Sequence, residues 1–404
     1  MTSNVKYFDG TQTGAPVLNA SNVQGNLIAL LDAVLINGYN LKTVASLTQS
    51  AGTATLTCSG HGFSVGQTLL LAGANEAQYN GEFKVLTITA NTLTFAIDPA
   101  APASATGASL SAKVAPLGWT KPYSGTNLAA YRATGGVTKH YLRLDDTVGT
   151  YSTKVWAAES MTDVNTGTGI YPPKLSDGTQ TTFTDRTRWF RCPGSSATVI
   201  DWVLFGDDKF FYFLPLNTNQ IRTLYYFGEI LSNVSGDQYH SVLNADDYQG
   251  AGAPNMSYTG QYTDGGQFNL NPDNTSAQNA TQLARSYLQV AGATWGNKAF
   301  NLVPGGGVGT YSGVNALAVT NFNPITGGVP LVPAILLEKT RVNRGTLPGM
   351  FFVAANAANT LFDKAIITGS YKGKTRNVLI LAVTSGQTTN VQTLMGFDIT
   401  GPFQ

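Results

Sequence analysis

The histidines are the first residues here that could perform chemistry, because imidazoles serve both as general bases and as metal ligands. His61, His140 and His240 stand far apart in the sequence. A base or a metal site needs partner residues beside the imidazole, and no HExxH, HxH or paired-cysteine motif supplies them. Cys58 and His61 have the i, i+3 spacing of metal ligands, but both lie in a Gly-rich turn region, so we predict a turn role for them.

A Gly-x-Ser-x-Gly sequence, the pattern of a hydrolase nucleophile elbow, occurs at residues 62–66. An elbow requires a strand before it and a helix after it, whereas the surrounding sequence predicts only strands and turns. His61 also adjoins the motif instead of coming from a distant loop. We therefore predict that Ser64 lies in a turn, and a hydrolase remains the third functional hypothesis.

Adjacent aspartates occur at Asp145-Asp146, Asp207-Asp208 and Asp246-Asp247. Neighbouring residues of a strand point to opposite faces, so no such pair offers two carboxylates to one substrate, as glycoside cleavage requires. The second pair falls at the tip of a predicted hairpin, where Asp favours the turn. Calcium binding by Asp246-Asp247 or Asp264-Gly265-Gly266 remains an alternative, because that ion prefers oxygen ligands.

The remaining candidates also favour structural roles. The run PGGGVG at residues 304–309 lacks the Lys-Ser/Thr pair and the strand-to-helix change of a phosphate-binding loop. Four tryptophans could stack on sugars, but neighbouring apolar or strand-like runs favour the core for most of them. They are Trp156, Trp189, Trp202 and Trp295. The sequence thus predicts no catalytic, cofactor-binding or metal-binding residue, and no enzyme.

Residues 199–230 contain the elements around which the rest of the chain is expected to fold, and these elements would position any functional site. Apolar and aromatic runs at 199–205, 210–216 and 221–230 are separated by turn residues, which predicts a three-stranded antiparallel meander. Several runs are apolar at consecutive positions, so both faces of this sheet should be covered. One cover would be the domain core, and another subunit could provide the other.

Composition limits the class of protein. The 404 residues suffice for two or three domains. Charged residues make up 12% of the chain, about half the usual ~25%, and the net charge is +1. Such a chain lacks the positive electrostatic field that would attract nucleic acid or an anionic membrane. Its low charge permits association with copies of itself.

Two cysteines, Cys58 and Cys192, are too few for a disulfide scaffold or a zinc knuckle. The N-terminal residues contain no apolar signal region, and no run is long enough to span a membrane. We therefore expect the chain to be made in a reducing cytoplasm.

The N-terminal part, residues 1–44, reads as an arm and a helix of the main domain. Residues 1–18 should be extended, and arms of this kind often dock on a neighbouring subunit. Ser21 and Gln24 form a capping box, and Asn37-Gly38 ends the helix. Its predicted apolar stripe consists of Val23, Leu27, Leu30, Leu31, Val34 and Leu35.

Residues 45–115 form a predicted insertion. Alternating polarity at 53–58, 83–88 and 92–97, with Gly-rich turns between, predicts a small β-barrel or sandwich module.

Residues 116–404 are the predicted main β domain, an antiparallel sheet or sandwich with a long exposed loop near 250–280. The fold class is therefore mainly β, all-β apart from one N-terminal helix. Turns are predicted at Arg344-Gly345 and Leu347-Pro348-Gly349, and strands at 137–145, 155–161, 331–337, 350–354 and 378–383.

Two sets of motifs carry a family resemblance. The module resembles a small β-domain of tailed-bacteriophage structural proteins through HGF (61–63), VG (65–66), LAGA (71–74), YNG (79–81), LTF (93–95) and ATG (105–107). Over residues 5–245 the chain resembles a family of uncharacterised virion structural proteins from phage and prophage tail regions. The motifs are GWTKPYSGTNLAAYR (118–132), YLRLDD (141–146), AAESMTDVNTGTG (157–169), VLFGDDKFFYF (203–213), YYFGEI (225–230) and, beyond that range, RGTLPGMF (344–351).

The resemblance implies a structural subunit of the virion, assembled in the cytoplasm of the host bacterium. We expect a homo-oligomer on the viral tail or baseplate side, with copies of itself and other tail proteins as partners and with no cofactor. A receptor-binding or carbohydrate-binding adhesin that recognises a host surface glycan is one alternative, and a capsid decoration protein is another.

Overall fold

The computed structural model describes residues 5–19, 23–147, 152–171, 187–191, 199–216, 222–247, 281–290, 298–300, 331–337, 342–353, 364–371, 373–384 and 392–403. The predicted loop at 250–280 lies outside these ranges. Within them the chain is mainly β, with antiparallel sheets and one short α-helix, which confirms the predicted fold class. No described helix has both the length and the apolar character needed to span a membrane.

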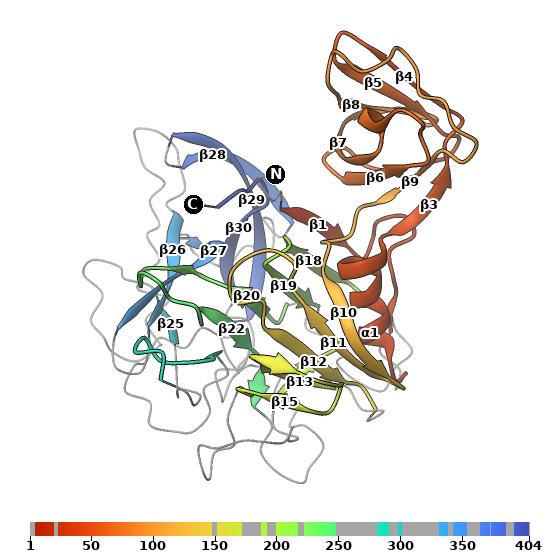
Figure 1. The fold of residues 1–404 in the computed structure, drawn as a ribbon. Coiled ribbons are helices and arrows are strands. Elements are labelled where there is room, and N and C mark those ends of the chain that lie inside the picture. The colour runs from red at the N-terminus through yellow and green to blue at the C-terminus, as the bar shows by residue number, and fades with distance from the viewer. Residues whose placement is uncertain are drawn as a thin grey trace.

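A central six-stranded antiparallel sheet forms the middle of the main body (Figure 1). In sheet order its strands are β1 (Lys6–Asp9), β18 (Trp202–Gly206), β19 (Phe210–Pro215), β20 (Tyr225–Glu229), β22 (Ser241–Asn244) and β24 (Thr281–Leu283). The predicted meander is confirmed, because β18, β19 and β20 pair in sequence. The predicted arm contributes β1, which pairs with β18 of its own chain.

The central sheet is apolar on both faces because aromatic residues occupy consecutive positions. Phe211 and Phe213 of β19 point into one buried cluster, whereas Phe210 and Tyr212 point into another. The second cluster also contains Leu381 and other residues of the C-terminal sheet. The expectation that another subunit could cover this face is therefore wrong, since the chain's own C-terminal strands cover it.

A second six-stranded sheet packs on the other side of the central sheet, across the first buried cluster. Its strands are β10 (Thr120–Gly125), β11 (Leu128–Arg132), β12 (Tyr141–Asp145), β13 (Ser152–Ala158), β16 (Thr187–Phe190) and β23 (Asp246–Asp247). Two short pairs flank the body: β14 (Ser160–Met161) with β15 (Gly167–Thr168), and β2 (Leu18–Asn19) with β17 (Val199–Ile200). Strand β17 thus separates the start of the predicted 199–205 run from β18.

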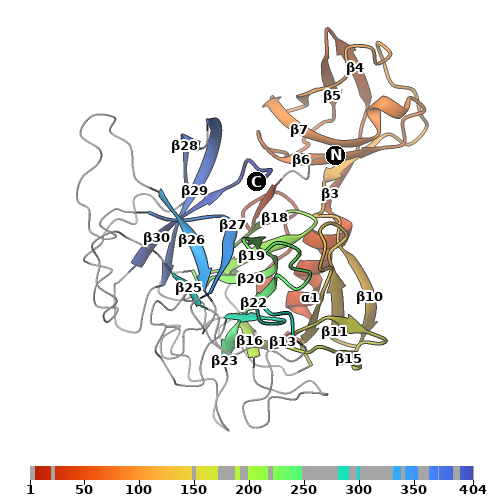
Figure 2. The same cartoon turned by 60° about the vertical axis from the view of Figure 1, so that its left-hand side comes forward.

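The third sheet is C-terminal and forms the remaining layer of the body (Figure 2). Its strands are β25 (Lys298–Phe300), β26 (Leu331–Leu337), β27 (Asn343–Val353), β30 (Gln392–Asp398), β29 (Lys374–Thr384) and β28 (Ala365–Tyr371), and β21 (Leu231–Ser232) pairs with β27. The predicted turns at 344–345 and 347–349 are wrong, because both lie inside β27. Gly345 is needed there because a Cβ atom would stand 2.0 Å from the Leu231 carbonyl oxygen.

The predicted helix begins later than its sequence indicates. Helix α1 spans Asn26–Leu31 and continues as the π-helical turn η1 (Asp32–Asn37), which ends at Gly38 as predicted. Gly25 occupies the N-cap and makes no side-chain capping bond. The Gln24 side chain instead bonds the Thr147 carbonyl, and Ser21 lies outside the described residues. The predicted capping box is therefore wrong.

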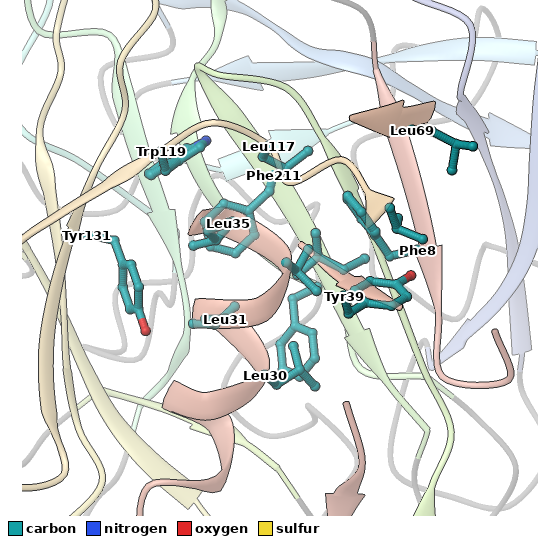
Figure 3. Close-up of a cluster of buried hydrophobic side chains, with 14 of the residues drawn as sticks. Phe8, Leu30, Leu31, Leu35, Tyr39, Leu69, Leu117, Trp119, Tyr131 and Phe211 are labelled. Atoms are coloured by element: carbon teal, nitrogen blue, oxygen red, sulfur yellow. The ribbon is translucent and has the colours of Figure 1, made fainter. Parts of the chain in front are cut away.

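The helix fills the space between the first two sheets. Figure 3 shows Leu31 and Leu35 between Tyr131 of β11 on one side and Tyr39 and Phe8 on the other. These side chains belong to one buried cluster. The predicted stripe is confirmed from Leu27 to Leu35, whereas Val23 remains 46% exposed.

Residues 39–114 form a separate seven-stranded antiparallel sheet that stands away from the body (Figures 1 and 2). In sheet order the strands are β3 (Tyr39–Thr43), β9 (Ser111–Val114), β6 (Thr68–Ala72), β7 (Gly81–Ile88), β8 (Thr92–Ala96), β5 (Thr53–Thr57) and β4 (Ser46–Ser50), with a 3-10 turn, η2 (Ala77–Tyr79). The three predicted alternating segments are β5, β7 and β8. Ser104 bridges Thr48, so a following segment covers the outer edge of β4.

Replacing Phe211 with Ala should lower the free energy of unfolding by about 3–5 kcal/mol, the usual cost of truncating a buried Phe. Phe211 is fully buried and meets Trp119 and Trp189 edge-on, with ring centroids at 5.3 and 5.9 Å. Chemical denaturation followed by tryptophan fluorescence measures the change. Val65→Ala is the control, since that side chain is 59% exposed. Equal stability of the two variants would contradict the packing described.

Candidate functional site

The module residues considered for chemistry have structural roles. The Phe63 N–H group donates to Nδ1 of His61 at 2.9 Å, and Nε2 of His61 lies 2.9 Å from the Thr89 carbonyl oxygen. An N–H group can only donate and a carbonyl can only accept, so His61 carries its proton on Nε2. Neither nitrogen is free to serve Ser64, which lies exposed in a turn. Burial raises the pKa of the Cys58 thiol, which disfavours the thiolate that would bind a metal.

The two residues of the Asp145-Asp146 pair separate as predicted. Asp145 accepts hydrogen bonds from Thr147, whereas Asp146 is fully buried. Its Oδ1 atom lies 3.4 Å from Nε of Arg191 and accepts the Thr153 hydroxyl at 2.9 Å. Burial raises the pKa of Asp146 to about 6, against the lowering effects of Arg191 and of backbone N–H groups at the start of α1. Asp146 therefore anchors the helix to the second sheet.

Asp207 holds the tight turn between β18 and β19. Its Oδ1 accepts the N–H groups of Lys209 and Phe210 at 2.8 and 3.2 Å, and its carbonyl accepts the Trp119 indole at 2.8 Å. Burial raises the pKa of Asp207 to about 6. The carbonyl of Asp208 accepts the Gly135 N–H group at 3.0 Å. Both aspartates thus have the turn role that the sequence predicts.

The described tryptophans are buried, as predicted, and none presents a face to solvent. Trp156, Trp189 and Trp202 are at most 2% exposed. The indole of Trp189 donates to the Asn244 carbonyl at 2.8 Å, and that of Trp202 donates to the Pro16 carbonyl at 3.0 Å. Stacking on a sugar would require these rings to leave the core.

Several candidates lie where the structure gives no side chain. Asp246-Asp247 forms β23, and only its backbone pairing with β16 is described. Cys192, Asp264-Gly265-Gly266, Trp295 and the 304–309 run lie outside the described residues. Among the side chains that are described, no three of His, Cys, Asp or Glu gather closely enough to hold a metal ion.

The other two histidines meet in a buried polar cluster that the sequence did not indicate. Glu229 accepts the backbone N–H groups of Val137 and Thr138, and its Oε2 lies 3.5 Å from Nε2 of His240. Nδ1 of His240 lies 2.6 Å from the Asp237 carbonyl oxygen. Burial works against charge on His240 and Glu229, but their pairing outweighs it, so the His240 pKa is raised and the Glu229 pKa is lowered.

His140 lies next to this pair and has a different character. Its Nδ1 lies 3.2 Å from the Tyr171 hydroxyl, which donates to the Ser241 hydroxyl at 3.1 Å. Burial lowers the His140 pKa to about 4, so the ring is neutral at neutral pH. Serine, tyrosine and histidine could form a proton relay, but each is at most 3% exposed. A substrate would have no access to Ser241, so the cluster is structural. The sequence did not indicate this cluster because its residues lie far apart in the chain.

His240 should make stability depend on pH. Its folded pKa exceeds the unfolded value of 6.5, so its contribution is complete below about pH 6.5 and is lost as pH rises through the folded pKa. The difference in unfolding free energy between the wild type and His240→Gln should therefore shrink as pH rises. Urea titrations from pH 6 to 9 measure it. A difference that grows with pH would contradict the assignment of charge.

A second cluster ties the C-terminal sheet to the N-terminal strand. The Lys364 ammonium lies 2.9 Å from Oδ2 of Asp9 and 2.8 Å from Oδ2 of Asp201. Asp201 also pairs with Arg222 at 3.2 Å, and Tyr7 donates to Asp9 at 2.7 Å. Burial alone would raise the Asp9 pKa, but the hydrogen bonds it accepts lower it. Lys364 occupies the space between the two carboxylates, so the cluster is a clamp between sheets.

Lys364→Met should lower the free energy of unfolding by about 1–2 kcal/mol, because it leaves Asp9 without its cation in a partly screened setting. Lys374→Met is the matched control, since Lys374 lies exposed at the start of β29. Denaturation at low and high salt measures both variants. If Lys364→Met behaves like the control, the clamp contributes nothing.

The module's outer surface is the remaining candidate for function. Strand pairing places Thr48, Thr55, Thr94 and Thr87 opposite one another across β4, β5, β8 and β7. All are exposed or half-buried. With the flanking rows they form a surface that we call the hydroxyl face: Ser46, Thr48, Ser50, Thr53, Thr55, Thr57, Thr87, Thr89, Thr92 and Thr94. Sequence alternation predicted β5, β7 and β8, but neither β4 nor the registers of the strands.

Four of the six charged residues of the module lie in strands on its other half, and the remaining two, Glu76 and Asp98, lie outside the strands. Lys42, Glu82, Lys84 and Lys113 belong to β3, β9 and the first half of β7. This half is nearer the body, and the strands β4, β5 and β8 of the hydroxyl face are farther from it (Figure 1). Strands β4, β5 and β8 therefore carry no charged residue, and exposed Asp98 lies two residues beyond the end of β8.

Polar contacts fix the module to the body. Nζ of Lys6 in β1 lies 2.5 Å from both Oε1 of Glu82 and the Pro116 carbonyl oxygen. The Tyr39 hydroxyl of β3 donates to the side-chain oxygen of Gln12 in the N-terminal segment. The N-terminal strand thus contacts both the module and the segment that leaves it, which holds the module in one orientation.

Comparisons with known proteins assign no family. No model of a protein family matches the chain, and a search of curated proteins found no match. Among solved structures, the phage phi92 endosialidase is similar at a TM-score of 0.17 and 11% identity, over 90% of this chain and 52% of that protein. The chain spans about half the length of that protein, and at this TM-score the similarity supports no conclusion about fold or function.

Proposed function

We propose that this chain is a non-enzymatic structural subunit of a tailed bacteriophage virion, where it forms a homo-oligomer on the tail or baseplate side. The observation that carries the proposal is that the chain's potentially reactive side chains are engaged in contacts within the fold. His61, Asp146, Asp207 and His240 all hold backbone or ion-pair contacts within the fold. Groups committed in this way support a geometric role, in which a rigid body carries a projecting module.

The sequence resemblance to phage tail-region proteins supports the choice of the virion. The 12% content of charged residues and the net charge of +1 support assembly, because copies of such a chain repel one another weakly. The partners in this proposal are copies of the chain and other tail proteins, with assembly in the host cytoplasm. A role as a capsid decoration protein would use the same features, and only the resemblance to tail-region proteins favours the tail.

Light scattering at two concentrations tenfold apart tests the assembly. We expect one mass that is an integral multiple of the protomer at both concentrations, and negative-stain images that show a particle of defined symmetry. A monomer at both concentrations would contradict homo-oligomerisation. Turnover of bacterial cell wall or glycan that disappears when one carboxylate or Ser64 is replaced would contradict the non-enzymatic role.

A further inference from the structure

The hydroxyl face has a uniform chemistry that the fold itself does not require. Its side chains are threonine and serine, apart from Ala96, in three rows, which cross the strands at Thr48–Thr55–Thr94–Thr87, Ser46–Thr57–Thr92–Thr89 and Ser50–Thr53–Ala96. Only the inner face of these strands is needed for the core. We propose that the hydroxyl face binds an uncharged glycan chain.

Charge is the first argument for this ligand. Residues 43–75 and 85–97, which contain most of the face and the turns around it, include no Asp, Glu, Lys or Arg. An anionic polysaccharide, a nucleic acid or a charged lipid surface would lose hydration there and gain no ion pair. A neutral ligand that carries many hydroxyl groups matches this surface.

Hydrogen-bonding capacity is the second argument. A threonine hydroxyl can donate one hydrogen bond and accept two, so it can pair with a sugar hydroxyl in either sense. The Thr87–Thr94 and Thr89–Thr92 hydroxyl pairs lie at 2.6 and 2.8 Å, which uses one interaction and orients the groups. The β-branched side chains have few rotamers, so little conformational entropy is lost when a ligand binds. The adjoining methyl groups can contact the C–H surfaces of sugar rings.

The face is also rigid. On the inner side of the same strands, Leu47, Leu56 and Leu93 face one another across β4, β5 and β8, and each is at most 2% exposed. Phe95 and Val85 are paired next to them and equally buried. The hydroxyl rows therefore keep the spacing of the sheet, about 4.8 Å between strands and about 6.8 Å between alternate residues.

The small area of the hydroxyl face argues against a second copy of the chain as its ligand. Four strands of about five residues cover roughly 15 by 17 Å, on the order of 250 Å². A stable protein interface buries about 800 Å² on each partner, several times more. A single polysaccharide strand lies within such a surface.

One face of this size should bind weakly, because few hydrogen bonds must offset the ordering of a flexible ligand. Several copies in one particle would strengthen attachment to a polymer through effective concentration. The stronger attachment through several copies rests on the proposed homo-oligomer. Binding of the glycan by a single module does not depend on it.

The test uses the full-length protein on an array that carries neutral bacterial O-polysaccharides beside anionic capsular polysaccharides. We expect binding to neutral polymers that salt does not weaken. The triple variant Thr48→Val/Thr55→Val/Thr94→Val keeps the side-chain shape and removes the central hydroxyl row. It should bind at least about tenfold more weakly, since three hydroxyl groups that pair with the ligand are lost. Thr48→Ser/Thr55→Ser/Thr94→Ser keeps the hydroxyls and should bind within a few-fold of the wild type.

Thr43→Val/Thr126→Val/Thr162→Val is the matched control, because these exposed threonines lie off the face. It should bind like the wild type. The proposal is overturned if the wild type binds no neutral polymer, if it prefers anionic ones, or if the Val variant of the central row binds unchanged. Light scattering of each variant reports its assembly and circular dichroism reports its folding, so a failure of the virion proposal leaves this result interpretable.

Discussion

The structure depends on burial of the central sheet on both faces. Strand β19 carries aromatic residues at successive positions, so each face of the sheet has its own apolar cluster and needs its own cover. The second sheet and helix α1 cover one face, and the C-terminal sheet covers the other. Because burial of one aromatic side chain contributes about 1.5–3 kcal/mol, loss of either cover would expose many such groups. The C-terminal strands are therefore part of the body's core.

Ionic contacts at the margins of these layers set how the sheets meet. Arg191 with Asp146 fastens the helix, Lys364 between two carboxylates fastens β28, and Glu229 with His240 fastens a loop. The first two join segments far apart in the sequence, and Glu229 also accepts the backbone N–H groups of the distant residues Val137 and Thr138. Buried charges are costly without partners, so arrangements of the layers that separate these pairs are penalised. Several side chains that could have suggested catalysis therefore serve in structural ion pairs.

The central meander, three of the module strands and the mainly β class could be predicted because alternation and aromatic runs are local signals. The helix start could not, because the carboxylate that meets it, Asp146, comes from a distant strand and replaces the expected cap. Gly345 suggested a turn but serves a close approach between strands, which depends on Leu231. The histidine cluster was hidden for the same reason: Glu229, His140 and Tyr171 meet only after folding. The residues expected to lie in turns, His61 and Asp207, did so because their partners are a few positions away or in an adjoining turn.

The apolar cluster of the body continues into the module through Phe8, Tyr39 and Leu69 (Figure 3). A module joined by a flexible linker would sample many directions, whereas one that shares packed side chains with its support moves only when that packing is broken. In a symmetric particle every protomer would therefore present its module at the same pitch and azimuth. The symmetry of the particle would then determine a regular spacing between neighbouring modules.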